Sequence, residues 1–138
     1  NSKGYQSRNF WYGLNFEANP KVIVIVEGPF DMLRFRSEGI PAIANLGVQL
    51  RNDATETVSD EKVMQLLSKG CTKVILALDA DTAGRKAVEG FTASFAKWGI
   101  EVYDLNLSRY LKNPDDKMDP GNAPMEVLQD LKSFVNSL

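Results

Sequence analysis

Acidic residues follow directly after two strongly apolar runs of the sequence. Glu27 comes after the run KVIVIV, and Asp79 and Asp81 come after KVILAL with one residue between them. We call these three residues the strand-end acids, because continuous apolar runs of this length are typical of strands covered on both faces. Crowded carboxylates repel one another unless a positive charge lies among them. A hard divalent ion with oxygen ligands, such as Mg²⁺, fits such a site.

Other acidic residues lie near these three in the sequence, and each also has an ordinary structural explanation. Asp31 follows Glu27 by four residues, where it is either a metal ligand or a residue that favours a helix N-terminus. Asp119 lies in a loop rich in turn-forming residues, and we interpret Asp115 and Asp116 in the same loop as solvated charges. Two aspartates in a DxD spacing are common in surface turns. Only their combination with a strand-end glutamate favours a metal site.

Glycines and basic residues accompany the acids. Gly28 and Gly84 lack the side chain that would keep a ligand away from the backbone, although Gly28 also suits a tight strand-to-helix turn. Arg85 and Lys86 are expected in the first turn of a helix, where the helix dipole disfavours cations. Either a bound phosphate or a salt bridge to a nearby carboxylate, Asp81 or Asp31, would offset that cost.

The composition excludes several kinds of chemistry. The 138 residues contain no histidine and one cysteine, Cys71, which excludes Ser-His-Asp and Cys-His catalysis and the usual zinc sites. A single cysteine allows no internal disulfide, so we expect a reducing compartment, the cytoplasm. No run approaches the ~20 apolar residues of a membrane span. The net charge of −2 argues against nucleic-acid binding by this chain alone, so metal ions or another domain would have to neutralise phosphates.

Predicted strands and helices alternate along the chain. Apolar runs predict strands over 21–26, 41–46, 73–78 and, nearer a sheet edge, 100–107. Helical periodicity predicts helices over 30–38, 60–69, 83–98 and from about residue 124 onward, with Met64 and Trp98 on buried faces. This alternation indicates right-handed crossovers and a parallel sheet, whose ligands bind beyond the carboxyl ends of the strands. The strand-end acids and Asp119 should therefore lie at one edge of one sheet.

Four segments resemble the Toprim domain shared by DnaG-type primases, topoisomerases and several nucleases. They are EGPFD (27–31), NLG (45–47), LDADTAGRKA (78–87) and DP (119–120), in the order and approximate spacing of that domain. The form of the first and third segments resembles the bacterial or phage primase branch. WYGLNFEA (11–18) resembles the segment that leads into the Toprim domain of bacterial primases. The aromatic cluster NFWYGL (9–14) predicts that the lead-in segment, 1–20, packs on the domain as a helix or an arm. The resemblance implies that residues 21–138 form a Toprim catalytic domain.

The resemblance also implies a fold and a chemistry. The fold is an α/β, Rossmann-like arrangement with about four mainly parallel strands flanked by helices. The chemistry is metal-dependent nucleotidyl transfer with two Mg²⁺ or Mn²⁺ ions. Glu27 would act as general acid or base and metal contact, Asp79 and Asp81 would hold the metals, and Asp31 and Asp119 would be further metal-site residues. The expected phosphate-binding residues are Gly28, Gly84, Arg85 and Lys86.

The implied partners are those of a DNA primase. They are nucleoside triphosphates, a single-stranded DNA template and RNA primer held through adjacent domains, and a replicative helicase, in the cytoplasm of a bacterial cell or phage-infected host, with no membrane partner. Because the chain begins with Asn1 and not with methionine, we expect a processed chain or an excised piece of a longer protein. We expect the isolated fragment to be inactive. Two other classes stay open: a Toprim nuclease that hydrolyses phosphodiester bonds, and a non-catalytic Toprim docking domain.

Overall fold

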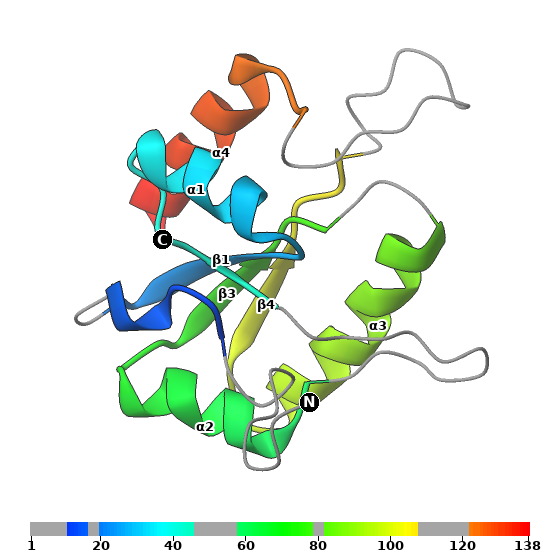
Figure 1. The fold of residues 1–138 in the computed structure, drawn as a ribbon. Helices are drawn as coiled ribbons and strands as arrows, with labels where there is room; N and C mark the ends of the chain where they lie inside the picture. The colour runs from blue at the N-terminus through cyan, green and yellow to red at the C-terminus, as the bar shows by residue number, and fades with distance from the viewer. Residues whose placement is uncertain (1–10, 17–19, 46–57, 79–81, 108–121) are drawn as a thin grey trace, which may run out of the picture.

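The computed structural model describes residues 11–16, 20–45, 58–78, 82–107 and 122–138. Strands and helices alternate in these residues, as the sequence predicted (Figure 1). The strands are β1 (Val22–Val26), β2 (Ala42–Ala44), β3 (Lys73–Leu76) and β4 (Glu101–Asp104). The helices are α1 (Pro29–Ser37), α2 (Asp60–Ser68), α3 (Thr82–Ala96), α4 (Met125–Ser137) and a short 3₁₀ helix, η2 (Leu14–Phe16).

The four described strands form one parallel sheet in the order β2-β1-β3-β4. The predicted four-stranded parallel sheet is therefore confirmed, and β4 lies at an edge as expected. In the register, Val26 pairs with Ala44, and Ile25 and Asp104 both pair with Leu76. The carboxyl ends of all four strands consequently meet at one edge of the sheet, which we call the carboxyl edge. The opposite edge is the amino edge.

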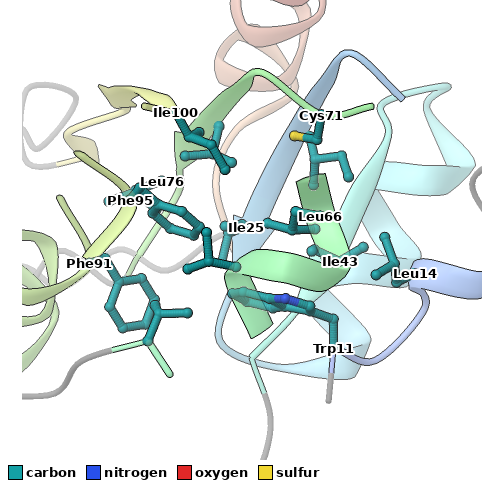
Figure 2. Packing of buried hydrophobic residues seen from close by; sticks show 14 of the residues in the cluster. Trp11, Leu14, Ile25, Ile43, Leu66, Cys71, Leu76, Phe91, Phe95 and Ile100 are labelled. Carbon is teal, nitrogen blue, oxygen red and sulfur yellow. The ribbon is translucent and has the colours of Figure 1, made fainter. Parts of the chain in front are cut away.

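Helices cover both faces of the sheet, α2 and α3 on one and α1 and α4 on the other (Figure 1). Alternate residues of β1 divide between these two cores because side chains alternate along a strand. Ile23 and Ile25 belong to the α2/α3 core, in which Trp11 and Phe95 stack with ring centroids 6.3 Å apart (Figure 2). Val24 and Val26 belong to the α1/α4 core. Burial on both faces explains why β1 is apolar at every position.

The described part of the lead-in segment packs on the α2/α3 core, as the sequence predicted. Trp11 and Leu14 are buried in that core (Figure 2). Tyr12 forms an antiparallel bridge with Ala44, through N–H···O bonds of 2.9 and 3.0 Å in the two directions. The backbone of this segment is thus held against the outer side of β2.

The same turn closes three helices at the amino edge. Each helix ends before a glycine with positive φ, and the next residue is buried and donates its N–H to a carbonyl five residues earlier, which is the Schellman pattern. The glycines are Gly39 (φ 80°), Gly70 (φ 88°) and Gly99 (φ 79°). The returning bonds are Ile40 to Phe35 (3.0 Å), Cys71 to Leu66 (3.1 Å) and Ile100 to Phe95 (3.1 Å).

Two predictions about buried side chains were wrong. Met64 is 49% exposed, because the buried side of α2 is formed by Lys62, Val63 and Leu66. Trp98 is 37% exposed, because α3 ends at Ala96 and the indole turns outward to donate to Asp60 Oδ1 at 3.1 Å. None of the helices among the described residues is both long and apolar enough to cross a membrane.

Candidate functional site

Glu27 lies at the carboxyl edge, immediately after the central strand β1. The hydrogen-bond ladder continues past the strand ends on both sides of β1. Asn45 N–H donates to Val26 O, and Ala77 N–H donates to Ile25 O, both at 2.9 Å. Glu27 is half-buried between these two continuing segments. A carboxylate predicted to bind metal therefore lies in the middle of the edge where parallel sheets bind ligands.

Asp31 lies beside the turn that carries Glu27. Pro29 starts α1, and Gly28 accepts from Met32 N–H at 3.1 Å to close its first turn. A Cβ added to Gly28 would lie 3.3 Å from Asp31 Oδ2, so the carboxylate folds back over the glycine. The φ of Gly28 is −118°, a value open to any residue. Glycine at this position therefore leaves room for the Asp31 carboxylate, and it is not needed for an unusual backbone conformation.

The remaining predicted metal ligands are outside the described residues. Leu78, the last described residue before the DxD, is buried; Asp79, Asp81 and Asp119 follow in undescribed segments, as do Asp115 and Asp116. Within the described ranges, no three His, Cys, Asp or Glu side chains are grouped so as to hold a metal. Glu27 and Asp31 are the two predicted ligands present there. As oxygen donors with no histidine anywhere in the chain, they fit a hard divalent ion.

Arg85 is paired with a carboxylate that sequence analysis did not identify. Its Nη1 donates to Asp104 Oδ1 at 3.0 Å and its Nη2 donates to Asp104 Oδ2, in a two-pronged ion pair about one-third exposed on each side. The hydrogen bond to Asp104 raises the pKa of Arg85, against the opposing effect of desolvation. Arg85 and Asp104 thus join the start of α3 to the end of β4. Of the other predicted phosphate-binding residues, Lys86 is exposed and Gly84 lies in the first turn of α3.

A second unpredicted arrangement joins the lead-in segment, α2 and the end of β2. Lys62 is only 2% exposed, and its Nζ donates to Asn45 Oδ1 and lies 4.3 Å from the centre of the Trp11 ring. Trp11 Nε1–H donates in turn to Lys62 O at 2.9 Å. Asn45 belongs to the NLG segment already noted in the sequence. Nothing in the sequence of α2 distinguishes Lys62 from a solvent-facing lysine.

Comparison with known proteins identifies the family. A Toprim-like family model matches residues 24–118. A DNA primase of Aquifex aeolicus is 39% identical over 116 residues, covering 83% of this chain and 20% of the relative. A DNA primase of Clostridium acetobutylicum is 36% identical over 132 residues, covering 91% of this chain and 20% of the relative. The chain therefore spans about one-fifth of the length of these curated relatives.

Solved structures show the same fold. The crystal structure of the zinc-binding and RNA polymerase domains of the Aquifex aeolicus primase has a TM-score of 0.71 at 29% identity, covering 99% of this chain and 32% of that one. A DnaG primase catalytic domain bound to single-stranded DNA has a TM-score of 0.67 at 19% identity, covering 99% and 42%. The chain belongs to the Toprim-like family. Within that family it groups with the Toprim domains of DnaG-type primases, as its sequence predicted.

Proposed function

We propose that this chain is the metal-dependent nucleotidyl-transfer domain of a DNA primase, which makes RNA primers for DNA replication. The observation that carries the proposal is the position of Glu27, half-buried at the end of the central strand with Asp31 beside its turn. The relatives support a catalytic role for this position in primer synthesis, because the curated relatives are DNA primases.

The proposed metal ligands are Glu27, Asp79 and Asp81, with Asp31 and Asp119 as additional ligands to two Mg²⁺ or Mn²⁺ ions. When bound, such ions lower the pKa of a primer 3′-hydroxyl and neutralise phosphate charge. Glu27 is the group that would accept the proton of that hydroxyl as its oxygen attacks the α-phosphorus of the incoming nucleotide in line. The bond from that phosphorus to the bridging oxygen breaks, and pyrophosphate leaves.

The start of α3 would hold the triphosphate. Arg85 and Lys86 are the fourth and fifth residues of α3, and Gly84 before them has no side chain to keep a phosphate away from the backbone. Asp104 holds the Arg85 guanidinium through two hydrogen bonds. These bonds limit the side-chain freedom that Arg85 would lose on binding a phosphate.

The other partners would be bound through parts of a longer protein. A net charge of −2 is too low for this chain to hold a nucleic acid by itself. We propose that adjacent domains hold the single-stranded DNA template and the RNA primer and contact a replicative helicase. The site of action would be the cytoplasm of a bacterial cell or a phage-infected host, and the isolated chain should not make primers.

Primer synthesis by the full-length parent protein tests the proposal. Glu27→Gln should abolish synthesis while far-ultraviolet circular dichroism shows a retained fold. Glu126→Gln is the matched control, since Glu126 is exposed in the first turn of α4; it should leave synthesis unchanged. Full synthesis by Glu27→Gln would contradict the proposal. Cleavage of labelled DNA or RNA with Mn²⁺ and no nucleotide would indicate a Toprim nuclease instead, and absence of both activities would favour a docking domain.

A further inference from the structure

The most exposed large apolar side chain among the described residues lies beside Glu27 in the chain. Phe30 is 83% exposed at the second position of α1, three residues after Glu27. Leu33 is 50% exposed one turn further along the same side of the helix, whereas Met32 and Phe35 are buried. Single exposed apolar residues are common on proteins. Phe30 and Leu33 instead form an apolar strip that begins at the carboxyl edge.

The direction of α1 brings the Phe30 side chain toward the carboxyl edge. Helix α1 begins at that edge, just after Glu27, and returns along the sheet toward the amino edge, because β2 is parallel to β1 (Figure 1). Each Cα–Cβ bond of an α-helix is tilted toward the helix N-terminus, so a side chain in the first turn leans over the start of the helix. At most about 10 Å of chain separates Phe30 from Glu27.

The charges on either side of Phe30 indicate which kind of molecule covers it. Phe30 lies in the chain between Glu27 and Asp31, both of which are proposed metal ligands. A protein surface packed closely on the ring would also take these carboxylates out of water, which is costly. A nucleotide fits better, because its base can stack on an aromatic ring and its phosphates are attracted to metal ions held by carboxylates.

We propose that the 3′-terminal base of the primer stacks on Phe30 and that Leu33 extends the apolar surface beside it. The inference rests on the proposed function, in which Glu27 accepts the proton of the primer 3′-hydroxyl. That reaction places the 3′-terminal nucleotide against Glu27, with its base within reach of the Phe30 ring. The base is stacked both before and during the attack, so Phe30 contributes to binding of the primer and leaves the chemical step unchanged.

Extension of a short RNA primer annealed to a DNA template, by the full-length parent protein, tests this role. Phe30→Leu keeps an apolar side chain and removes the aromatic face. It should raise the KM for the annealed primer about tenfold and change kcat by less than about twofold. Phe30→Trp keeps a stacking face and should have the parental KM. The matched control is Trp98→Leu, which removes a partly exposed ring at the amino edge and should leave both constants unchanged.

The outcomes separate this inference from the proposed function. Because Phe30 is mostly exposed, neither replacement should change the melting temperature of the parent protein. A parental KM in Phe30→Leu, or a fall in kcat alone, would overturn the role of Phe30 while leaving the proposed function intact. A lowered melting temperature in Phe30→Leu would also overturn it, because another part of the longer protein would then cover the ring. No primer extension by the parent would overturn the proposed function and this inference with it.

Discussion

At the amino edge of the sheet three connections use one turn, whereas at the carboxyl edge the described connections differ from one another. Gly39, Gly70 and Gly99 all have φ near 80–90° and each is followed by a buried residue that bonds back to its helix. Each turn is formed within six consecutive residues. The amino edge is thus specified by local sequence, and each of its turns returns the chain to the next strand.

The carboxyl edge depends on contacts between distant parts of the chain. Asn45 is bonded to Lys62, and Arg85 is bonded to Asp104. Each of these hydrogen bonds involves a charged side chain. Glu27 lies at the same edge because it directly follows β1 and only a short turn separates it from α1. From this comparison we expect the amino edge to contribute more to stability, and the chemistry that we propose lies at the carboxyl edge.

The largest expected effect on stability is at the amino edge. Gly70→Ala and Gly99→Ala place a Cβ in the left-handed region, and each should lower the free energy of unfolding by about 1–2 kcal/mol. The cost is one of backbone conformation, because an added Cβ would have no heavy atom within 4 Å at either position. Urea denaturation of the chain measures it. An unchanged free energy of unfolding in both variants would contradict the expectation that the turns of the amino edge contribute to stability.

Gly28→Ala is the corresponding change at the carboxyl edge. Its φ of −118° suits alanine, so the free energy of unfolding should change by no more than about 0.5 kcal/mol. The new Cβ would, however, lie 3.3 Å from Asp31 Oδ2 and displace that carboxylate. Mn²⁺ affinity should therefore fall although the fold is unaffected, as a titration would show. A loss of stability equal to that of Gly70→Ala, with Mn²⁺ binding retained, would contradict this prediction.

A smaller effect is expected from the ion pair of Arg85. Asp104→Asn should lower the free energy of unfolding by about 0.2–1 kcal/mol, since the pair is one-third exposed and screened by solvent. The difference between parent and variant should shrink as salt is added. Denaturation curves at low and high salt provide the measurement. A large loss of stability that added salt does not reduce would show instead that the ion pair belongs to the structural core.

The smallest expected effect concerns Cys71, the buried residue after Gly70. Burial raises the pKa of its thiol from 9.0 to about 11. The thiol pKa is higher in the folded chain than in the unfolded chain. The buried, protonated thiol therefore makes its full contribution to stability below pH 9, and that contribution is lost as the pH rises through 11. At pH 8 a disulfide reagent should label Cys71 only at the rate at which the protein opens. Rapid labelling of the folded chain would contradict this prediction, because it would show that the Cys71 thiol is accessible to solvent at the amino edge.

The elements were predictable from sequence because their signals are local. Continuous apolar runs located β1 and β3, and glycines marked the ends of α1, α2 and α3. Among the described residues, the predicted strand 41–46 is paired at Ala42–Ala44, and the predicted strand 100–107 is shorter, at Glu101–Asp104.

The site was predictable only in part. Glu27 lies where the rule for parallel sheets placed it, and Asp31 lies beside its turn. The positions of Asp79, Asp81 and Asp119 are outside the described residues, and the metal-binding roles of all five acids stay predictions. The bond from Trp11 to Lys62 spans 51 residues and that from Arg85 to Asp104 spans 19. No periodicity or motif encodes such pairs, since they depend on which helix packs over which strand.

Mn²⁺ titration of the chain and of Glu27→Gln tests the central claim most directly, which is that the carboxyl edge is a divalent-metal site containing Glu27. The parent should bind Mn²⁺, and Glu27→Gln should bind it at least about tenfold more weakly, because one full ligand charge is lost. Glu126→Gln, altered at an exposed position of α4, should bind like the parent. Equal Mn²⁺ affinity in the parent and Glu27→Gln would contradict the claim.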